Sequence, residues 1–244
     1  MTETPPEVIK LLAHDLRWQL VRALAVSDYR VNELVAQVGQ PLNLVSYHLK
    51  QLREGRLVTV RRSEADGRDN YYSLDLDHLR RVYGAAGSAI HPAVSGSVTT
   101  DQPLQHTSVL FVCTHNSARS QMAEALMRHL SAGQIHASSA GSEPATIHPD
   151  AVRTMDALDI DIRAQHSKGF EDVLGRSFDT VITVCDRARE VCPVFPGAGQ
   201  HLHWGLPDPA AIEDPHQRQQ AFTDTAQRLQ ARIQHYLTEL KTGA

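Results

Sequence analysis

The segment from residue 108 to residue 130 joins an apolar run to a polar loop and then to an amphipathic helical pattern. Residues 108–112 (SVLFV) have the composition of a strand that is buried on both faces, as strands of parallel sheets are. Beyond the loop, apolar side chains recur at helical spacing: Met122, Ala125, Leu126 and Leu130. This order of strand, loop and helix constrains the fold of the second half of the chain more than any other feature.

The rest of the second half continues the alternation. We expect strands at residues 136–140, 180–184 and 201–204, and helices around residues 150–158 and 222–240. Alternating strands and helices are typical of a parallel sheet that is covered on both faces. The sequence therefore predicts an α/β domain over residues 108–244, built on a parallel four-stranded sheet.

The loop between the first strand and its helix has the chemistry of an anion-binding site. A loop in this place can turn its backbone N–H groups inward, and the N-terminus of the helix adds positive potential. We expect such a loop to bind a tetrahedral oxyanion and to lower the pKa of Cys113 at its base. Arg119 can hold two oxygens of the anion with its planar guanidinium, and Ser120 can hydrogen-bond the thiolate. The candidate oxyanion-binding residues are Thr114, His115, Asn116, Ser117, Ala118, Arg119 and Ser120.

The first part of the chain follows a different pattern. Helical spacing over residues 5–24, 31–38 and 42–54 is followed by two strand-like runs, 57–62 and 70–74, which are separated by a hairpin tip. This order is that of a winged helix-turn-helix, so the fold expected here is mostly α. We place the DNA-binding domain at residues 1–83, including a short last helix at 77–83. The stretch 84–107 is rich in Gly, Ser, Thr, Ala and Pro, and is expected to be a linker.

Charge supports the division into two parts. The net charge of −4 covers 12 basic and 11 acidic residues up to position 83, and 12 basic and 17 acidic residues beyond it. Five basic side chains lie close together in the first part and offer DNA a local positive patch: Lys50, Arg53, Arg56, Arg61 and Arg62.

Three cysteines, all beyond residue 110, are expected to be reactive thiols rather than a disulfide framework. The sequence begins without a signal-peptide pattern and contains no apolar run long enough to span a bilayer, so we expect a cytoplasmic protein that is not attached to a membrane. We expect no tightly bound cofactor and no metal, although His201 and His203 share one face of a predicted strand.

The segment VLFVCTHNSARSQMAEAL resembles the low-molecular-weight tyrosine phosphatase fold family, and its arsenate reductase branch in particular. The resemblance covers residues 108–240. It implies that Cys113 is the nucleophile and that Asp208, in an Asp-Pro loop, is the general acid that protonates the leaving oxygen. Asp214-Pro215 is a second Asp-Pro pair, but no predicted strand precedes it. His115 departs from the family pattern, where many relatives carry glycine, and Ala118 replaces a cysteine of some reductases.

Cys185 and Cys192 distinguish a reductase from a phosphatase. A phosphatase transfers its phosphoryl group from Cys113 to water and needs no further thiol, whereas a reductase must deliver two electrons to arsenic. Resemblance to the thioredoxin-coupled reductases implies that Cys185 attacks Cys113 and that Cys192 then attacks Cys185, leaving a disulfide for thioredoxin or a similar dithiol. Structural thiols are the alternative. The shared fold also implies residual phosphatase activity.

The N-terminal part resembles the arsenic-repressor family of dimeric winged-helix regulators, through the stretches LLAHDLRWQLVRAL, VNELVAQVGQPLNLVSYHLKQLREGRLVTVRR and GRDNYYSLD. The resemblance implies that residues 42–54 enter the major groove of operator DNA and that the outer helices form a homodimer. Candidate DNA-contacting residues are Asn43, Ser46, Tyr47, His48, Lys50, Gln51, Arg53, Arg62 and Arg68. His48 has packing as its alternative role. The domain has no cysteine for an arsenite inducer, so a speculative hypothesis is that the three thiols of the other half bind arsenite.

Three functions remain open at this point. The first is a bifunctional arsenic-response protein, in which a repressor is fused to an arsenate reductase acting on arsenate or phosphate oxyanions. The second keeps the same site as a tyrosine phosphatase. The third is a transcription factor whose enzyme-like half senses an oxyanion or redox state. The operator, the inducer, the physiological reductant and any coupling between the halves are not encoded in a recognisable pattern.

Overall fold

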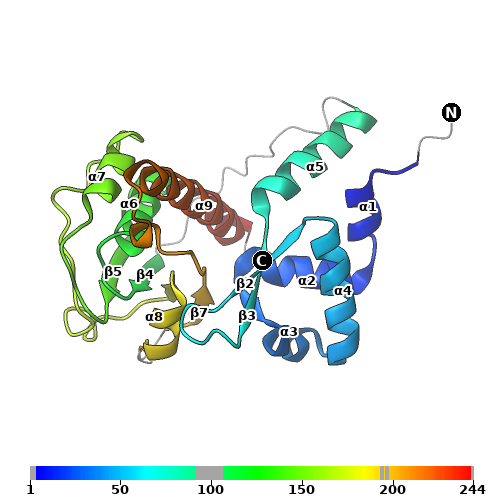
Figure 1. The fold of residues 1–244 in the computed structure, drawn as a ribbon, viewed down its shortest axis with the longest axis horizontal. Coiled ribbons are helices and arrows are strands. Elements are labelled where there is room, and N and C mark those ends of the chain that lie inside the picture. The colour runs from blue at the N-terminus through cyan, green and yellow to red at the C-terminus, as the bar shows by residue number, and fades with distance from the viewer. Residues whose placement is uncertain (1–3, 92–106, 193–194, 196–197, 243–244) are drawn as a thin grey trace. The chain divides into compact units, whose positions relative to one another are not determined.

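The computed structural model describes residues 4–91, 107–192, 195 and 198–242. The chain divides into two compact units, residues 1–101 and 102–244 (Figure 1). Within the described residues, no helix combines the length and the apolar character that crossing a membrane requires.

The N-terminal unit is mostly helical and carries one small antiparallel sheet of strand order β1-β3-β2. Its elements are α1 (Glu7–Leu12), α2 (Asp15–Val26), β1 (Tyr29–Arg30), α3 (Val31–Val38), α4 (Leu42–Glu54), β2 (Val58–Arg62), β3 (Asn70–Leu74) and α5 (Leu76–Ile90). Helices α3 and α4 form the helix-turn-helix, and β2 and β3 form the wing. The mostly α winged helix-turn-helix predicted from the sequence is confirmed.

Apolar side chains at helical spacing form the hydrophobic core of this unit. Leu20, Leu34, Val45 and Leu52 come from three helices and are completely buried. Helix α3 ends at Gly39, whose φ of +63° is a left-handed conformation that costs glycine little. The turn between α3 and α4 is therefore set locally, while the packing of the helices is set by this core.

Three local features differ from the sequence prediction. The helix expected over residues 5–24 is two helices, because His14 is extended and its Nδ1 accepts a hydrogen bond from the backbone N–H of Leu16 at the start of α2. A short strand, β1, pairs with β3 and was not predicted. The last helix does not end at Tyr83 but continues to Ile90, because Ala86 packs into the core and no proline interrupts the backbone. Residues 84–90 are thus helical, and Thr107, the last residue of the expected linker, begins the first strand of the C-terminal unit. Residues 92–106 of that linker lie outside the described residues.

The C-terminal unit is an α/β structure on a four-stranded parallel sheet of order β5-β4-β6-β7, as predicted. Its elements are β4 (Thr107–Cys113), α6 (Arg119–Leu130), β5 (Ile135–Gly141), α7 (Pro149–Asp156), β6 (Thr180–Thr183), α8 (Asp186–Val191), β7 (Gln200–His203), the 3₁₀ turn η2 (Pro209–Ala211) and α9 (Pro215–Thr242). Helix α8 was not predicted, and α9 starts seven residues earlier than expected.

The core of this unit holds β4 at its centre. Every residue from Val109 to Cys113 is buried, and α6 packs on β4 and β5. Helix α9 lies beside α6 (Figure 1) and buries Phe222, Leu229 and Ile233, which are seven and four residues apart. Packing therefore fixes the strand β4 before the loop 113–119 and the helix α6 after it.

Because the two units have separate cores, a cavity in one should loosen that unit alone. Leu52→Ala removes a fully buried side chain of α4 and should cost the N-terminal unit about 2–5 kcal/mol. Hydrogen–deuterium exchange followed by mass spectrometry should show faster exchange in α2, α3 and α4 and unchanged exchange in β4 and β5. Equal acceleration in both sets of peptides would contradict two separate cores.

Candidate active site

The loop after β4 closes around the sulfur of Cys113. The backbone N–H of Asn116 donates to Sγ of Cys113 over 3.1 Å, and Oγ of Ser120 lies 2.8 Å from the same sulfur. Ser120 stands in the first turn of α6, which begins at Arg119. The nucleophile predicted from the sequence therefore lies at the base of a loop and in front of a helix N-terminus, as expected.

The outer side of the loop is held by the segment that follows β5. The backbone N–H groups of Glu143, Ala145 and His148 donate, over 2.9 Å each, to the loop carbonyls of Thr114, His115 and Ser117. In a trans peptide the N–H points away from the C=O, so carbonyls that face outward leave the N–H groups of the following residues facing inward. The loop can then offer several N–H donors to one oxyanion.

Two further contacts make this loop geometry specific. Asn116 has a φ of +44°, and its side-chain amide donates to Ser120 while its Oδ1 accepts from the backbone N–H of Lys168 at 2.7 Å. Gly141 leaves no room for a side chain, because an added Cβ would lie 2.5 Å from the carbonyl oxygen of Thr114. Sequence inspection missed Lys168 and Gly141, since nothing local marks a contact with a loop that is distant along the chain.

Arg119 is buried and lies beside the carboxylate of Asp208. Its guanidinium donates to the carbonyl of Leu206 at 2.7 Å and lies 3.3 Å from Oδ2 of Asp208. Asp214, the other Asp-Pro candidate, instead caps α9 through the backbone N–H of Gln217. Of the two, Asp208 is the one that the structure brings to the loop.

Burial raises the pKa of the Cys113 thiol, and the neighbouring Cys185 raises it further. The hydrogen bond with Ser120 and the charge of Arg119 act in the opposite direction and lower the pKa. The sequence-based expectation of a lowered pKa is therefore wrong for this structure, because desolvation of the sulfur outweighs the groups that stabilise a thiolate. The hydrogen bond with Ser120 and the charge of Arg119 limit this rise in the pKa of Cys113.

Cys185 follows β6, the strand next to β4, and lies two residues beyond its end. Strands β4 and β6 are parallel, with Val112 paired to Thr183, so Cys113 and Cys185 follow the same edge of the sheet. The hydroxyl of Thr114 lies 3.4 Å from Sγ of Cys185 and connects the loop to the second thiol. The structure thus brings together two cysteines that are 72 positions apart in the sequence.

The third thiol is separated from the second by one short helix. Cys185 is the N-cap of α8, with its sulfur accepting from the N–H of Ala188, and Cys192 is the C-cap. Burial raises the pKa of Cys192 to about 11. All three cysteines are thiols that form no disulfide among the described residues.

His203 has a buried role that sequence inspection did not find. Its Nδ1 lies 2.8 Å from the hydroxyl of Thr183, and its Nε2 lies 3.0 Å from Oδ1 of Asp186, the first residue of α8. His201, which shares its strand, is exposed. Among the described residues, no group of three or more His, Cys, Asp or Glu side chains could hold a metal ion.

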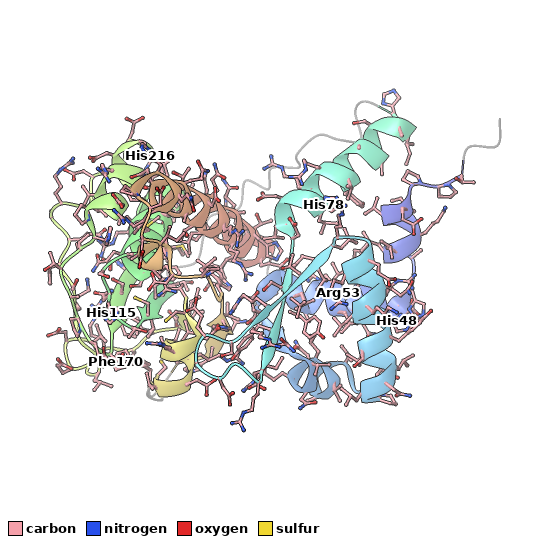
Figure 2. All side chains as sticks on the ribbon, in the orientation of Figure 1. His48, Arg53, His78, His115, Phe170 and His216 are labelled. Atoms are coloured by element: carbon pink, nitrogen blue, oxygen red, sulfur yellow. The ribbon has the colours of Figure 1, made fainter. Side chains whose placement is uncertain are left out.

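On the N-terminal unit, five of the nine candidate DNA-contacting residues share the exposed surface of α4: Asn43, Ser46, Tyr47, Lys50 and Arg53. Figure 2 labels Arg53 and His48 on this helix. Gln51 is half-buried and donates to Glu54. Arg62 is exposed at the end of β2. Arg68, near the wing tip, forms an ion pair with Asp66 at 2.9 Å.

His48 does not belong to the exposed surface of α4. Its side chain is 4% exposed and its ring lies 4.3 Å from that of His14, centroid to centroid. Burial lowers the pKa of His48, and His14 and Arg17 lower it further. As a candidate for base contact His48 was therefore wrong, because it follows Val45 by three positions and so faces the core.

The wing is tied to the helix-turn-helix by Arg30. Its guanidinium lies 2.7 Å from Asp69, in the loop that connects the two strands of the wing, and 3.3 Å from Glu33 on α3. It also lies 5.9 Å from the ring centre of Tyr71. Arg61 stacks over the same ring at 5.0 Å. These contacts position the wing without using Arg62.

Residues 108–244 match the model of the family described as low molecular weight phosphotyrosine protein phosphatase. The chain belongs to this family. Residues 14–60 match the model of the bacterial regulatory proteins of the arsR family, so an arsR-type helix-turn-helix precedes the phosphatase-family domain.

Several proteins to which this chain is similar are named arsenate reductases. The chain is 39% identical to an arsenate reductase of Halalkalibacterium halodurans over 105 residues. This aligned region covers 43% of this chain and 76% of that protein. The chain is 37% identical over 130 residues to arsenate reductase 1 of Bacillus cereus, covering 53% and 92% of the two chains. A solved arsenate reductase in its phosphate-binding state is 30% identical, with a TM-score of 0.49, and covers 55% of this chain and 98% of its own.

The contact between Ser120 and Cys113 gives a testable effect on reactivity. Ser120→Ala removes the hydrogen bond that lowers the pKa of Cys113, so the pKa should rise further and less thiolate should exist at pH 7.5. We expect iodoacetamide to alkylate Cys113 about tenfold more slowly, as measured on its tryptic peptide. Ser117→Ala is the matched control in the same loop and should alkylate at the native rate. Equal rates in all three proteins would remove Ser120 from this role.

Proposed function

We propose that the C-terminal unit is an arsenate reductase that uses three thiols in sequence, and that the N-terminal unit is a DNA-binding repressor. One observation carries the enzymatic part: a buried cysteine in an oxyanion loop has a second buried cysteine just beyond the end of the adjacent strand, and the hydroxyl of Thr114 lies 3.4 Å from the sulfur of that second cysteine. A hydrolytic enzyme has no use for that second thiol.

In the first step the thiolate of Cys113 attacks arsenic. A sulfur–arsenic bond forms while one arsenate oxygen leaves as water, after accepting a proton from Asp208. The inward N–H groups of the loop and the guanidinium of Arg119 hold the other oxygens, where negative charge accumulates. The 3.3 Å contact between Arg119 and Asp208 supports this arrangement, since it places the acid and the anion clamp side by side.

In the second step the thiolate of Cys185 attacks the sulfur of Cys113. A Cys113–Cys185 disulfide forms, the sulfur–arsenic bond breaks, and its electron pair stays with arsenic, which leaves as arsenite. Cys192 then attacks the sulfur of Cys185, so the Cys113 thiolate is released and a Cys185–Cys192 disulfide remains. An external dithiol such as thioredoxin reduces that disulfide and completes the cycle.

The last exchange requires α8 to unwind. Cys185 and Cys192 cap opposite ends of this helix, and seven residues at 1.5 Å of rise separate their Cα atoms by about 10 Å. A disulfide needs Cα atoms roughly 4.4–6.8 Å apart. Helix α8 has only six residues, and short isolated helices are marginal, so unwinding it is feasible.

The DNA-binding part rests on the exposed side of α4 and on the wing. We propose that α4 enters the major groove and that Arg62 and Arg68 approach the backbone. A homodimer through the outer helices would present two copies of α4 to a pseudo-palindromic operator. Two large apolar side chains on α5, Tyr83 and Ile90, are 56% and 78% exposed and support such an interface.

The relay predicts that each cysteine is essential for turnover. With arsenate, thioredoxin, thioredoxin reductase and NADPH, the full chain should consume NADPH. Cys113→Ser, Cys185→Ser and Cys192→Ser should each reduce the rate at least a hundredfold, because each removes one transfer of the electron pair.

The same proteins distinguish a phosphatase from a reductase. Hydrolysis of an aryl phosphate that survives loss of Cys185 and Cys192, together with no consumption of NADPH, would show a phosphatase and overturn the relay. Silence in both assays would favour an oxyanion or redox sensor.

For DNA binding, Arg53→Gln should weaken affinity for all duplexes alike, because an exposed arginine at the end of α4 contacts phosphate rather than bases. Fluorescence anisotropy at several salt concentrations should show the salt slope of binding falling by about one per chain. Arg228→Gln, on the exposed side of α9, is the matched control. An unchanged slope in Arg53→Gln would exclude this contact.

A further inference from the structure

A cavity of about 580 Å³ lies in the C-terminal unit, between α6, the edge strand β5 and the segment 160–168. Its walls are distinct from the loop that surrounds Cys113. Charged and polar side chains in its wall include Glu124, Arg128, Ser138, Lys168 and Arg176, and its apolar wall is formed by Ala125, Ile160 and Ala164.

The cavity wall has more positive than negative charge. Glu124 is buried and shared by two cations, with Arg128 at 2.5 Å and Lys168 at 3.3 Å. The other carboxylate of the wall, Asp161, lies 3.1 Å from Arg163, a residue outside the wall that also pairs with Asp156. The wall itself holds two carboxylates and three cations, the third of which is Arg176.

Arg176 adds a third cation to the wall. Its guanidinium donates to the hydroxyl of Ser138 at 2.9 Å and lies 5.2 Å from the ring centre of Phe178. Among the residues that the structure describes, no carboxylate pairs with it. A guanidinium has five N–H donors, so most of those on Arg176 can reach a ligand. This positive wall contrasts with residues 84–244 as a whole, where 17 acidic residues outnumber 12 basic ones.

We propose that this cavity binds a phosphate group, either as the free ion or as the monoester of a small molecule. A planar guanidinium, an ammonium and a hydroxyl are the donors that phosphate oxygens accept from most readily. Arg176, Lys168 and Ser138 supply one of each. The volume is larger than one tetrahedral ion needs, and the apolar wall gives an organic group a surface to contact.

The cavity is also connected to the loop around Cys113, through Lys168. Lys168 donates from its backbone N–H to Asn116, and from its ammonium to Glu124 and to the carbonyl of His166. An anion that draws the ammonium of Lys168 away from Glu124 acts on the same residue that holds Asn116. Phosphate in the cavity would therefore contact a residue that also holds the loop around Cys113.

Equilibrium dialysis of the full chain with radiolabelled inorganic phosphate tests this directly. The native chain should bind two phosphates: one at the loop, lost in Arg119→Ala, and one in the cavity, lost in Arg176→Gln. The double variant should bind none, and Arg228→Gln should bind two. Phosphate binding at the loop in Arg176→Gln would also show that this variant is folded. Arg128→Gln is a second variant, which should weaken phosphate binding only in the cavity.

Glucose 6-phosphate identifies the source of the phosphate group. If it displaces phosphate from the cavity of Arg119→Ala, the ligand is a monoester, and if phosphate binds there but the ester does not, the ligand is the free ion. A single site that Arg119→Ala abolishes would overturn the proposal. So would a second site that Arg176→Gln and Arg128→Gln leave unchanged.

Discussion

The backbone hydrogen bonds between the segment after β5 and the loop after β4 determine what the C-terminal unit can do. They turn the carbonyls of Thr114, His115 and Ser117 outward and therefore the following N–H groups inward. The oxyanion site that we propose depends on this orientation of the loop. Gly141 leaves no room for a side chain beside the carbonyl of Thr114, and the side-chain amide of Asn116 donates a hydrogen bond to Ser120 within the site.

A second constraint brings the thiols together. Because β4 and β6 are parallel and in register, their carboxyl ends place Cys113 and Cys185 at one edge of the sheet. Burial at this edge raises the pKa of Cys113, so a thiolate has to be stabilised by Ser120, Arg119 and the loop. Hydrogen bonds thus hold the sulfurs of Cys113 and Cys185 in the site. Cys192 lies at the other end of the short helix α8.

How far the sequence predicts the structure depends on the range of the interactions. The strand at 108–112, its loop and α6 were predictable, since burial and helical periodicity are local signals. Helix α8 was not, because its residues are polar and its start is stabilised by His203, a contact with β7. His48 could have been placed in the core from its spacing to Val45 and Leu52. Lys168 could not, since only the fold brings it to Asn116.

A single-turnover reaction tests the three-thiol account most directly. Reduced full-length protein is mixed with excess arsenate and no external dithiol, quenched with an alkylating agent, and analysed by mass spectrometry. The account predicts about one arsenite released per chain, a Cys185–Cys192 disulfide and an alkylated Cys113. Release of no arsenite, with all three cysteines alkylated, would contradict it.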